Sequence, residues 1–379
     1  MKHSTRLMTG TAAFAAVAIA FTGCAPGGAT DEPSADGLTP VTLQLQWFAQ
    51  AQFGGYYAAV DQGFYEDEGL DVTLQEGGAD IVPQDALVSG DADYAISWVP
   101  KVLGSIEQGA NITSIAQIFE RSATMQVSFK EQNITSAEDL AGHTVGSWGY
   151  GNEWEIFAGL QQAGVGVDDI TLVTQAFDML GLLQGDIDAA QAMTYNEYAQ
   201  VLESVNPETG ELYQPEDLNI IDWNEEGSGM LQDSIWADAD RLANDPEYQA
   251  TTVKFLKASI RGWLYAMGDP QASADIVTAA GSTLGTSHQL WMANEVNKLI
   301  WPSTNGIGIT DEAAWDRTVE IAMETQNETG ATILTKLPPE TAHTNKYIQM
   351  ALDELIADGV DVMNDSYQPI TVTLNEGGK

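Results

Sequence analysis

Basic residues are scarce in this chain. Its 379 residues include 14 Lys and Arg against 55 Asp and Glu, which gives a formal net charge of −41 at pH 7. Nucleic acids and anionic lipid head groups are bound through Lys and Arg, so this composition argues against both as partners. The acidic residues are spread along the chain rather than gathered in one tail. This indicates a solvated acidic surface, of the kind that suits an extracellular protein in a salty medium.

Cysteine is almost absent, because Cys24 is the only one. A single cysteine excludes a disulfide within the chain and argues against a cysteine-based metal site or nucleophile. The histidines show no metal-ligand spacing. The chain also has no Gly-x-Ser-x-Gly elbow and no Gly-x-x-x-x-Gly-Lys phosphate loop. We therefore expect a protein that is not an enzyme and that uses no cofactor and no metal.

Long hydrophobic runs are missing except for a short one near the N-terminus. Residues 11–21 (TAAFAAVAIAF) follow the basic residues Lys2 and Arg6, a pattern typical of a secretory signal peptide. The run ends at Gly23-Cys24, which resembles the cleavage box of bacterial lipoproteins. We expect residues 1–23 to be a signal peptide and Cys24 to carry a diacylglycerol. An ordinary signal peptide with an incidental cysteine is the alternative.

Residues 24–40 are rich in small, polar, Pro and Gly residues, which is typical of a flexible tether. The mature protein is thus expected to be exported and lipid-anchored on the outer face of the cytoplasmic membrane, at the cell surface or in the periplasm.

Strand and helix patterns alternate after the tether. Strands are expected at 41–46, 71–75, 94–98 and 112–118, with helices between them, and a second βα series runs from 143 to about 193. Such alternation favours mostly parallel sheets flanked by helices. Residues 175–183 are expected to be helical, the chain beyond 239 mainly helical, and residues 369–378 (PITVTLNEGG) a last strand and tail.

A short pattern occurs in both series. Residues 87–95 read LVSGDADYA and residues 182–190 read LLQGDIDAA. Each places a Gly-Asp-x-Asp turn between a helix and a strand, which supports two similar α/β lobes. We expect lobe 1 to begin with 41–127, lobe 2 to span 128–232, 233–330 to return to lobe 1 with mainly helical structure, and 331–379 to form a C-terminal helix and strand extension.

The stretch QWFAQAQFGGYYAAVDQGFYEDEGLDVTLQEGG (46–78) resembles the opening of periplasmic-type solute-binding proteins. The likeness is to the group that binds the pyrimidine precursor of thiamine and to its relatives for riboflavin, taurine and alkanesulfonates. Further matches are the Gly-x-Ala-Asp turn at 90–93 and ITSAEDLAGHTVG at 134–146, and the likeness covers about 41–330. It implies the two-lobed type II periplasmic binding fold, with a ligand cleft between the lobes. It also implies an ABC permease with its ATPase as partner.

Pyrimidine synthases resemble the same family but use a cysteine-rich motif and a first-loop histidine. This chain has no second cysteine, and Phe53 stands at the histidine position, so synthesis is not expected. Gln50 replaces a usual Asn, and the loop is closer to that of riboflavin-type relatives.

Candidate ligand contacts follow the ends of predicted strands, where open α/β sheets bind ligands. Aromatic faces stack on flat heterocycles, while amides and carboxylates read ring nitrogens and amino groups. After the strands of lobe 1 these candidates are Trp47, Gln50, Gln52, Tyr56, Ser97 and Trp98. Core packing is the alternative for Trp47, and Tyr57 is expected to be core.

In lobe 2 the Gly-rich loop 147–153 could offer free N–H groups to a polar ligand edge, or it could be an ordinary turn. Its candidates are Trp148, Gly149, Tyr150, Asn152 and Glu153. Tyr195, Asn196 and Glu197 follow the next strand, where Asn and Glu act either as a helix cap or as a donor–acceptor pair. Asp233, near the return to lobe 1, could hold an amino group.

Taken together, these features predict a monomeric solute-binding lipoprotein that closes on a small flat nitrogen heterocycle, either the thiamine pyrimidine precursor or a related vitamin such as riboflavin. A binding protein for a taurine- or sulfonate-type anion, a synthase on the same fold and a structural surface lipoprotein are the alternatives.

Overall fold

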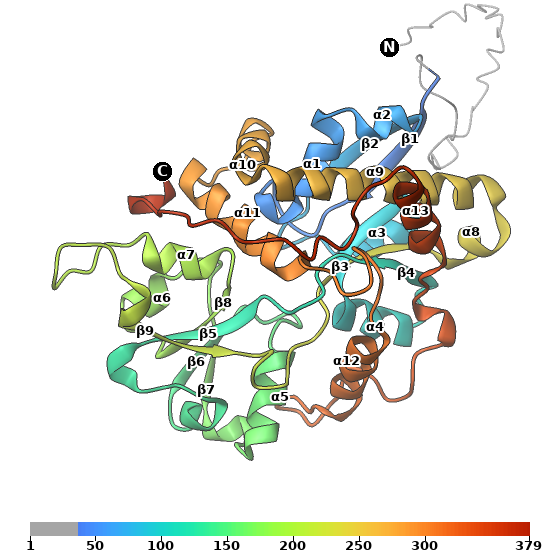
Figure 1. The fold of residues 1–379 in the computed structure, drawn as a ribbon. Helices are drawn as coiled ribbons and strands as arrows, with labels where there is room; N and C mark the ends of the chain where they lie inside the picture. Colours follow the sequence, from blue (N-terminus) through green and yellow to red (C-terminus); the bar gives the residue numbers. More distant parts are fainter. Residues whose placement is uncertain (1–36) are drawn as a thin grey trace, which may run out of the picture. The chain divides into compact units, whose positions relative to one another are not determined.

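The computed structural model describes residues 37–379, so the expected signal peptide, Cys24 and most of the tether lie outside the described residues. Two five-stranded sheets organise this part of the chain (Figure 1). The first sheet has the order β2-β1-β3-β10-β4. Its strands are β1 (Thr39–Gln44), β2 (Leu70–Gln75), β3 (Tyr94–Trp98), β4 (Ile112–Gln117) and β10 (Asp233–Asp238).

The second sheet has the order β7-β6-β8-β5-β9. Each sheet contains one reversed strand: β10 is antiparallel to both its neighbours, and so is β5. The other pairings are parallel. This is the two-lobed, mostly parallel α/β fold that the alternating pattern predicted. The second set of strands is β5 (Thr124–Phe129), β6 (Thr144–Ser147), β7 (Thr171–Thr174), β8 (Ala189–Met193) and β9 (Leu218–Asp222).

We call each sheet with its flanking helices a lobe. Helices α1, α9, α10, α11 and α13 pack together on the first lobe, while α5 to α7 belong to the second. The first half of the chain supplies α1 (Gly54–Asp61), α2 (Phe64–Asp67), α3 (Pro83–Ser89), α4 (Val99–Glu107), α5 (Trp154–Ala163), α6 (Leu180–Leu183) and α7 (Glu197–Leu202). The second half supplies α8 (Ala239–Asn244), α9 (Pro246–Gly268), α10 (Pro270–Ala279), α11 (Thr286–Ile300), α12 (Glu312–Glu324) and α13 (Lys346–Ala357). Within residues 37–379, no helix is both long enough and apolar enough to cross a membrane.

The Gly-Asp-x-Asp turn has the same geometry in both lobes. Gly90 and Gly185 adopt φ values of 79° and 78°, which favour glycine. In lobe 1 the second aspartate, Asp93, accepts the backbone N–H of Thr42 at 2.9 Å. In lobe 2 Asp188 accepts the N–H of Thr144 at 2.8 Å. The repeated motif therefore joins each helix to the same point of its sheet.

The Gly-Gly pair after the first strand serves helix packing. A Cβ on Gly55 would lie 2.2 Å from the Trp263 ring, and one on Gly262 would lie 2.0 Å from the Gly55 carbonyl oxygen. Only glycine at these two positions lets α1 and α9 approach so closely. Phe53 and Tyr56, on either side of the pair, are fully buried against this contact.

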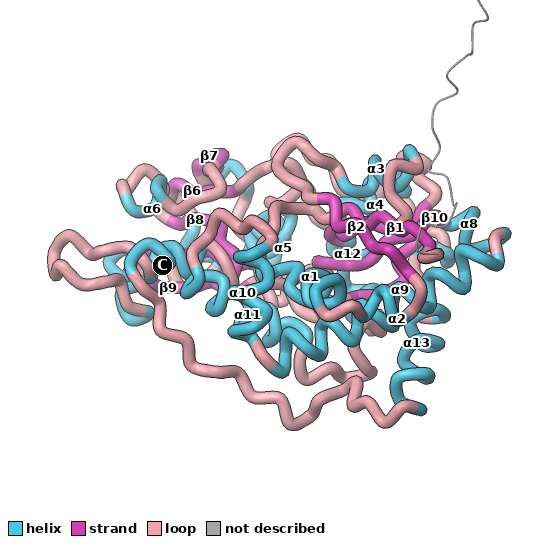
Figure 2. Tube along the Cα trace, turned by 90° about the horizontal axis from the view of Figure 1, so that it is seen from above, coloured by secondary structure: helices cyan, strands magenta, loops and turns pink. Residues whose placement is uncertain are grey.

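Two expected elements are wrong. Residues 175–183 form a helix only at Leu180–Leu183. Gln175 is held outside a helix, because its side chain bonds the Gln191 backbone and its N–H donates to the Ser147 carbonyl at 2.8 Å. Residues 369–378 form no strand. Figure 2 shows the chain after α13 as a long loop toward the second lobe; residues 369–378 lie at its end, with one 3-10 turn at Glu376–Gly378. Its hydrogen bonds go to single groups, such as Ile370 N–H to Asn294 at 2.9 Å and Gly377 N–H to the Glu203 carbonyl at 3.0 Å, and not to a sheet edge.

The two lobes are joined by two adjacent crossings of the chain, between β4 and β5 and between β9 and β10. Gln232 on the second crossing accepts the Ala123 N–H at 2.9 Å and donates to the hydroxyls of Ser122 and Thr124. Asn224 donates to the Ser122 carbonyl at 2.7 Å. Side-chain amides thus fasten the two crossings into one hinge.

Candidate ligand-binding cavity

A cavity of about 590 Å³ lies between the lobes. It opens where β1 and β3 of the first sheet and β6 and β8 of the second end, because its lining residues directly follow these strands. This is the position at which open α/β sheets bind ligands, and the volume is that of a typical small-molecule site.

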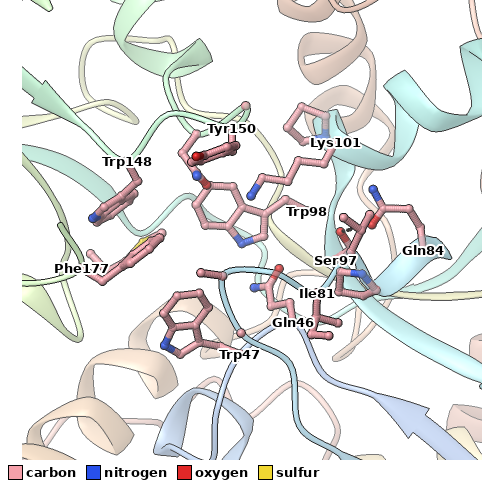
Figure 3. A pocket seen from close by; sticks show the side chains of 18 of the residues that line it. Gln46, Trp47, Ile81, Gln84, Ser97, Trp98, Lys101, Trp148, Tyr150 and Phe177 are labelled. Carbon is pink, nitrogen blue, oxygen red and sulfur yellow. Dashed lines mark hydrogen bonds between the residues drawn. The ribbon is translucent and has the colours of Figure 1, made fainter. Parts of the chain in front are cut away.

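Aromatic side chains from both lobes form the walls (Figure 3). Trp47 and Trp98 come from the first lobe, and Trp148, Tyr150 and Phe177 come from the second. Trp47 contacts Phe177 of the other lobe at a centroid distance of 4.7 Å with a tilt of 53°, and Trp148 stacks on Phe177 at 6.4 Å with an interplanar angle of 14°. Tyr150 is 90% exposed and lies at the mouth. Facing aromatic surfaces of this kind suit a flat ring system.

Asp233 organises the polar side of the first lobe without lining the cavity. It is 3% exposed and accepts three hydrogen bonds: from Gln46 at 2.6 Å, Gln52 at 2.8 Å and the Trp98 indole N–H at 2.9 Å. Burial raises the pKa of Asp233 to about 6, against the lowering effect of these three donors. Asp233 thus positions cavity-lining side chains and lies outside the lining itself, so its expected contact with an amino group stays a prediction.

A glutamine relay continues from this carboxylate. An ionised carboxylate only accepts hydrogen bonds, so Gln46 and Gln52 must each point the amide NH₂ toward Asp233. The oxygen of Gln52 then accepts the NH₂ of Gln50 at 2.6 Å. No residue in the described part of the chain donates to the remaining oxygens of Gln46 and Gln50. Both side chains line the cavity, so these oxygens are the acceptors offered to a ligand.

Lys101, in the first turn of α4, is the cationic side chain of the cavity lining. Its ammonium lies 4.7 Å from the Trp98 ring centroid, and Figure 3 shows the side chain extending past this ring toward Tyr150. The ammonium has no hydrogen-bond or ion-pair partner among residues 37–379. Burial lowers the pKa of Lys101 to about 8, opposed by the negative charges of Glu153 and Asp233.

Asn196 and Glu197 follow β8 on the opposite wall and are bonded to each other at 2.8 Å. Glu197 also accepts the Met193 N–H at 3.0 Å, and burial raises its pKa to about 7. Asn196 makes no side-chain cap on α7. The side-chain oxygen of Asn196 is hydrogen-bonded to His288 Nε2 at 2.9 Å, and His288 Nδ1 is hydrogen-bonded to Glu203 at 3.0 Å. His288 therefore joins α11 of the first lobe to the second lobe.

The expectation of free N–H groups in the loop 147–153 is wrong for most of the loop. The N–H of Trp148 donates to Gln191, that of Gly149 to Ser147, that of Gly151 to Glu153, and that of Asn152 to the Gly149 carbonyl. These distances are 3.2, 3.2, 3.1 and 3.1 Å. The loop uses its donors to hold its own shape, so it presents side chains rather than an anion-binding nest.

The structure places most of the expected ligand contacts in the cavity lining. These are Trp47, Gln50, Gln52, Ser97, Trp98, Trp148, Tyr150, Asn152, Tyr195, Asn196 and Glu197. Four lie outside the lining: Tyr56, buried against Trp263 at a centroid distance of 5.4 Å, together with Gly149, Glu153 and Asp233. That the lining residues bind ligand stays a prediction.

Several lining residues were not expected, among them Gln46, Gln84, Lys101 and Phe177. Gln46 follows β1 as directly as Trp47 does, so the strand-end rule could have found it. Lys101 carried a weaker signal, as one of very few bases and in the first turn after a strand. Phe177 gave none, because its segment was assigned to a helix.

The described residues contain no cluster of three or more His, Cys, Asp or Glu side chains placed to hold a metal ion.

The fold is that of the periplasmic binding proteins. The periplasmic sulfonate-binding protein SsuA of Methylobacillus flagellatus superposes with a TM-score of 0.57 at 15% identity, over 89% of this chain and 99% of that one. At this identity the likeness establishes the fold alone. Residues 50–273 match the model of the NMT1/THI5 like family, and the chain belongs to that family.

Two curated relatives are named as binding proteins. The riboflavin-binding protein RibY of Chloroflexus aurantiacus is 25% identical over 301 residues, which cover 75% of this chain and 80% of RibY. The formylaminopyrimidine-binding protein of Halalkalibacterium halodurans is 22% identical over 256 residues, covering 67% and 73%. Other relatives, such as one from Aspergillus parasiticus at 23% identity, are named as 4-amino-5-hydroxymethyl-2-methylpyrimidine phosphate synthases.

Proposed function

We propose that this protein is an extracytoplasmic solute-binding protein that holds a small flat nitrogen heterocycle between its lobes and delivers it to an ABC permease. The observation that carries the proposal is the interlobe cavity with aromatic side chains on both walls. Aromatic contact supplies much of the affinity for a flat ring, and a few placed amides and carboxylates orient it. The names of the riboflavin- and formylaminopyrimidine-binding relatives support this ligand class.

Binding is coupled to closure of the lobes. The crossings held by Gln232 and Asn224 are the place where the lobes can turn relative to each other. A ligand that touches Trp47 on one lobe and Trp148 on the other favours the closed state, because only that state offers both contacts. Transport follows when the permease recognises the closed lobes. The similar SsuA of Methylobacillus flagellatus is described as part of a sulfonate ABC transporter, which supports this partner.

Anchoring is part of the proposal. The lipoprotein-like box at Cys24 would place the binding lobes outside the cell on a tether. Expression of the full chain and of Cys24→Ser, followed by detergent phase partition, tests this. The wild-type chain is expected in the detergent phase and the variant in the aqueous phase, and equal partition would contradict the anchor.

A thermal-shift panel on the full chain tests the ligand class, with thiamine pyrimidines, thiamine, riboflavin and taurine as probes. A ligand at 100 times its Kd stabilises the folded state by about 2.7 kcal/mol, which a melting curve detects. We expect stabilisation by at least one heterocycle. Stabilisation by taurine alone would replace the heterocycle by a sulfonate. Turnover in the presence of pyridoxal phosphate and iron would instead establish the synthase alternative.

A further inference from the structure

The polar groups of the cavity are sorted by hydrogen-bond type. On the β1 side, Asp233 fixes the amide orientations of Gln46 and Gln52, and Gln52 fixes that of Gln50. Reversing the amide of Gln46 or Gln52 would bring an oxygen toward the carboxylate, and reversing that of Gln50 would bring its oxygen against the Gln52 oxygen. The hydrogen-bond network therefore orients the oxygens of Gln46 and Gln50 toward the cavity as acceptors, and they require an N–H donor on the ligand.

Lys101 is the counterpart of this acceptor edge. Its ammonium can only donate hydrogen bonds, and no residue in the described part of the chain accepts from it. The negative charge of Glu153 attracts the ammonium, but Glu153 forms no hydrogen bond or ion pair with it. One carboxylate oxygen of Glu153 instead accepts the Gly151 N–H at 3.1 Å. A Cβ on Gly151 would lie 3.9 Å from Lys101 Cγ, so the lysine stem reaches the second lobe. A partly buried ammonium without a hydrogen-bond or ion-pair partner favours a ligand that brings an electron-rich oxygen.

We propose that the cavity selects a flat heterocycle with a ring N–H that donates to Gln46 or Gln50 and an oxo or acidic oxygen that accepts from Lys101. This is the chemistry of cyclic imides and lactams. A pyrimidine that carries only amino and alkyl groups satisfies the glutamines and leaves Lys101 unpaired. The inference rests on the proposed function and sharpens it, since it states which functional groups the heterocycle carries.

A matched set of probes tests the two ends of the ligand separately on the unaltered full chain. Lumiflavin has an imide N–H between two oxo groups. Its 3-methyl derivative keeps the oxo groups and lacks the N–H, while the aminopyrimidine 4-amino-2,5-dimethylpyrimidine has an amino group and no oxygen. Titration calorimetry is expected to rank lumiflavin at least tenfold tighter than either. Equal or tighter binding of the 3-methyl derivative or the aminopyrimidine would overturn the inference, although the binding function would stand.

The lysine is tested by Lys101→Met, which keeps the length of the stem and removes the charge. Lys130→Met, at an exposed position in the second lobe away from the cavity lining, is the matched control. Lys101→Met is expected to weaken lumiflavin binding at least tenfold and to change aminopyrimidine binding little, while the control changes neither. Unchanged lumiflavin binding by a folded Lys101→Met would overturn the inference. Binding of taurine and of no heterocycle would overturn the proposed function as well.

Discussion

The side-chain amide of Gln52 donates to Asp233 Oδ2 at 2.8 Å and accepts from Gln50 at 2.6 Å, so one buried carboxylate sets the polarity of a chain of amides. In Asp233→Asn an NH₂ can replace Oδ2 and face the NH₂ of Gln52. The relay must then reverse and present donors to the cavity. We expect the affinity for a heterocycle to fall by about tenfold or more, since a ligand donor that faces a protein donor stays unsatisfied at a cost of about 1–3 kcal/mol.

Calorimetry with riboflavin and the pyrimidine probes measures this effect. Asp71→Asn, on the exposed side of β2, is the control and is expected to bind as the unaltered chain does. Unchanged affinity in Asp233→Asn would mean that the amide orientations do not matter to the ligand.

Phe177 lies between Trp47 and Trp148 and is 42% exposed, so it contributes to the cavity more than to the core. Phe177→Ala removes one aromatic face, which costs about 0.5–1.5 kcal/mol beyond the lost area. The Kd for a flat ligand is expected to rise about tenfold while the melting temperature without ligand shifts little. Leu337→Ala, at a 71% exposed position, is the control. A large loss of stability without ligand would assign Phe177 to the core instead.

Glu155 links stability to pH. It accepts the Met230 N–H at 2.6 Å and the Ser122 hydroxyl at 3.1 Å, and burial raises its pKa from 4.5 to about 7. The folded state binds this proton more tightly than the unfolded state, so the stabilisation is complete below pH 4.5 and is lost as pH rises toward 7. The loss amounts to about 3 kcal/mol at about 1.4 kcal/mol per pKa unit.

Glu155→Gln is expected to lose less stability than the unaltered chain between pH 5 and pH 8, because the amide does not ionise. Urea unfolding at both pH values measures the difference, and the exposed Glu138→Gln is expected to follow the unaltered chain. Parallel pH profiles for Glu155→Gln and the unaltered chain would contradict the linkage.

Gln232 fastens the hinge through one accepted and two donated hydrogen bonds. Gln232→Leu leaves the buried Ala123 N–H and the hydroxyls without this partner, and each unsatisfied buried group costs about 1–3 kcal/mol. The free energy of unfolding in urea is expected to fall by about 2–4 kcal/mol. Gln349→Leu, on the exposed face of α13, is expected to lose less than 1 kcal/mol. Similar losses of unfolding free energy in Gln232→Leu and Gln349→Leu would contradict the role of Gln232 in fastening the hinge.

The charge of −41 is expected to make stability depend on salt. Repulsion among surface carboxylates destabilises the folded state, and salt screens it within about 10 Å at 0.1 M and 3 Å at 1 M. The melting temperature is therefore expected to rise between 0.1 M and 1 M NaCl. Sucrose, which brings no ions, is the control additive. A melting temperature that does not rise with NaCl would contradict a salt-adapted surface.

Much of the fold was predictable because it depends on local patterns. The apolar patterns predicted the parallel strands of both sheets and β4, but not β5, β9 and β10. The two Gly-Asp-x-Asp turns occupy the same place in both lobes because a left-handed glycine and a bonding aspartate act within a few residues. The position of Trp47, Trp98 and Trp148 at strand ends predicted that they lie in one cavity, and all three line it. The strand predicted at 369–378 was wrong, because an alternating pattern cannot show whether a free sheet edge is within reach.

The sequence by itself therefore determined the two-lobed α/β fold and the edge of each sheet at which aromatic and amide side chains gather. Only the tertiary structure decided the electrostatics of the site. Asp233 is distant in sequence from Gln46 and Gln52, and its burial beneath them sets which end of each amide meets a ligand. Lys101 became informative only when its ammonium proved to lie in the cavity without a partner among residues 37–379. Burial, and the choice of which amide end donates and which accepts, arise from contacts between distant segments, so a local sequence pattern cannot predict them.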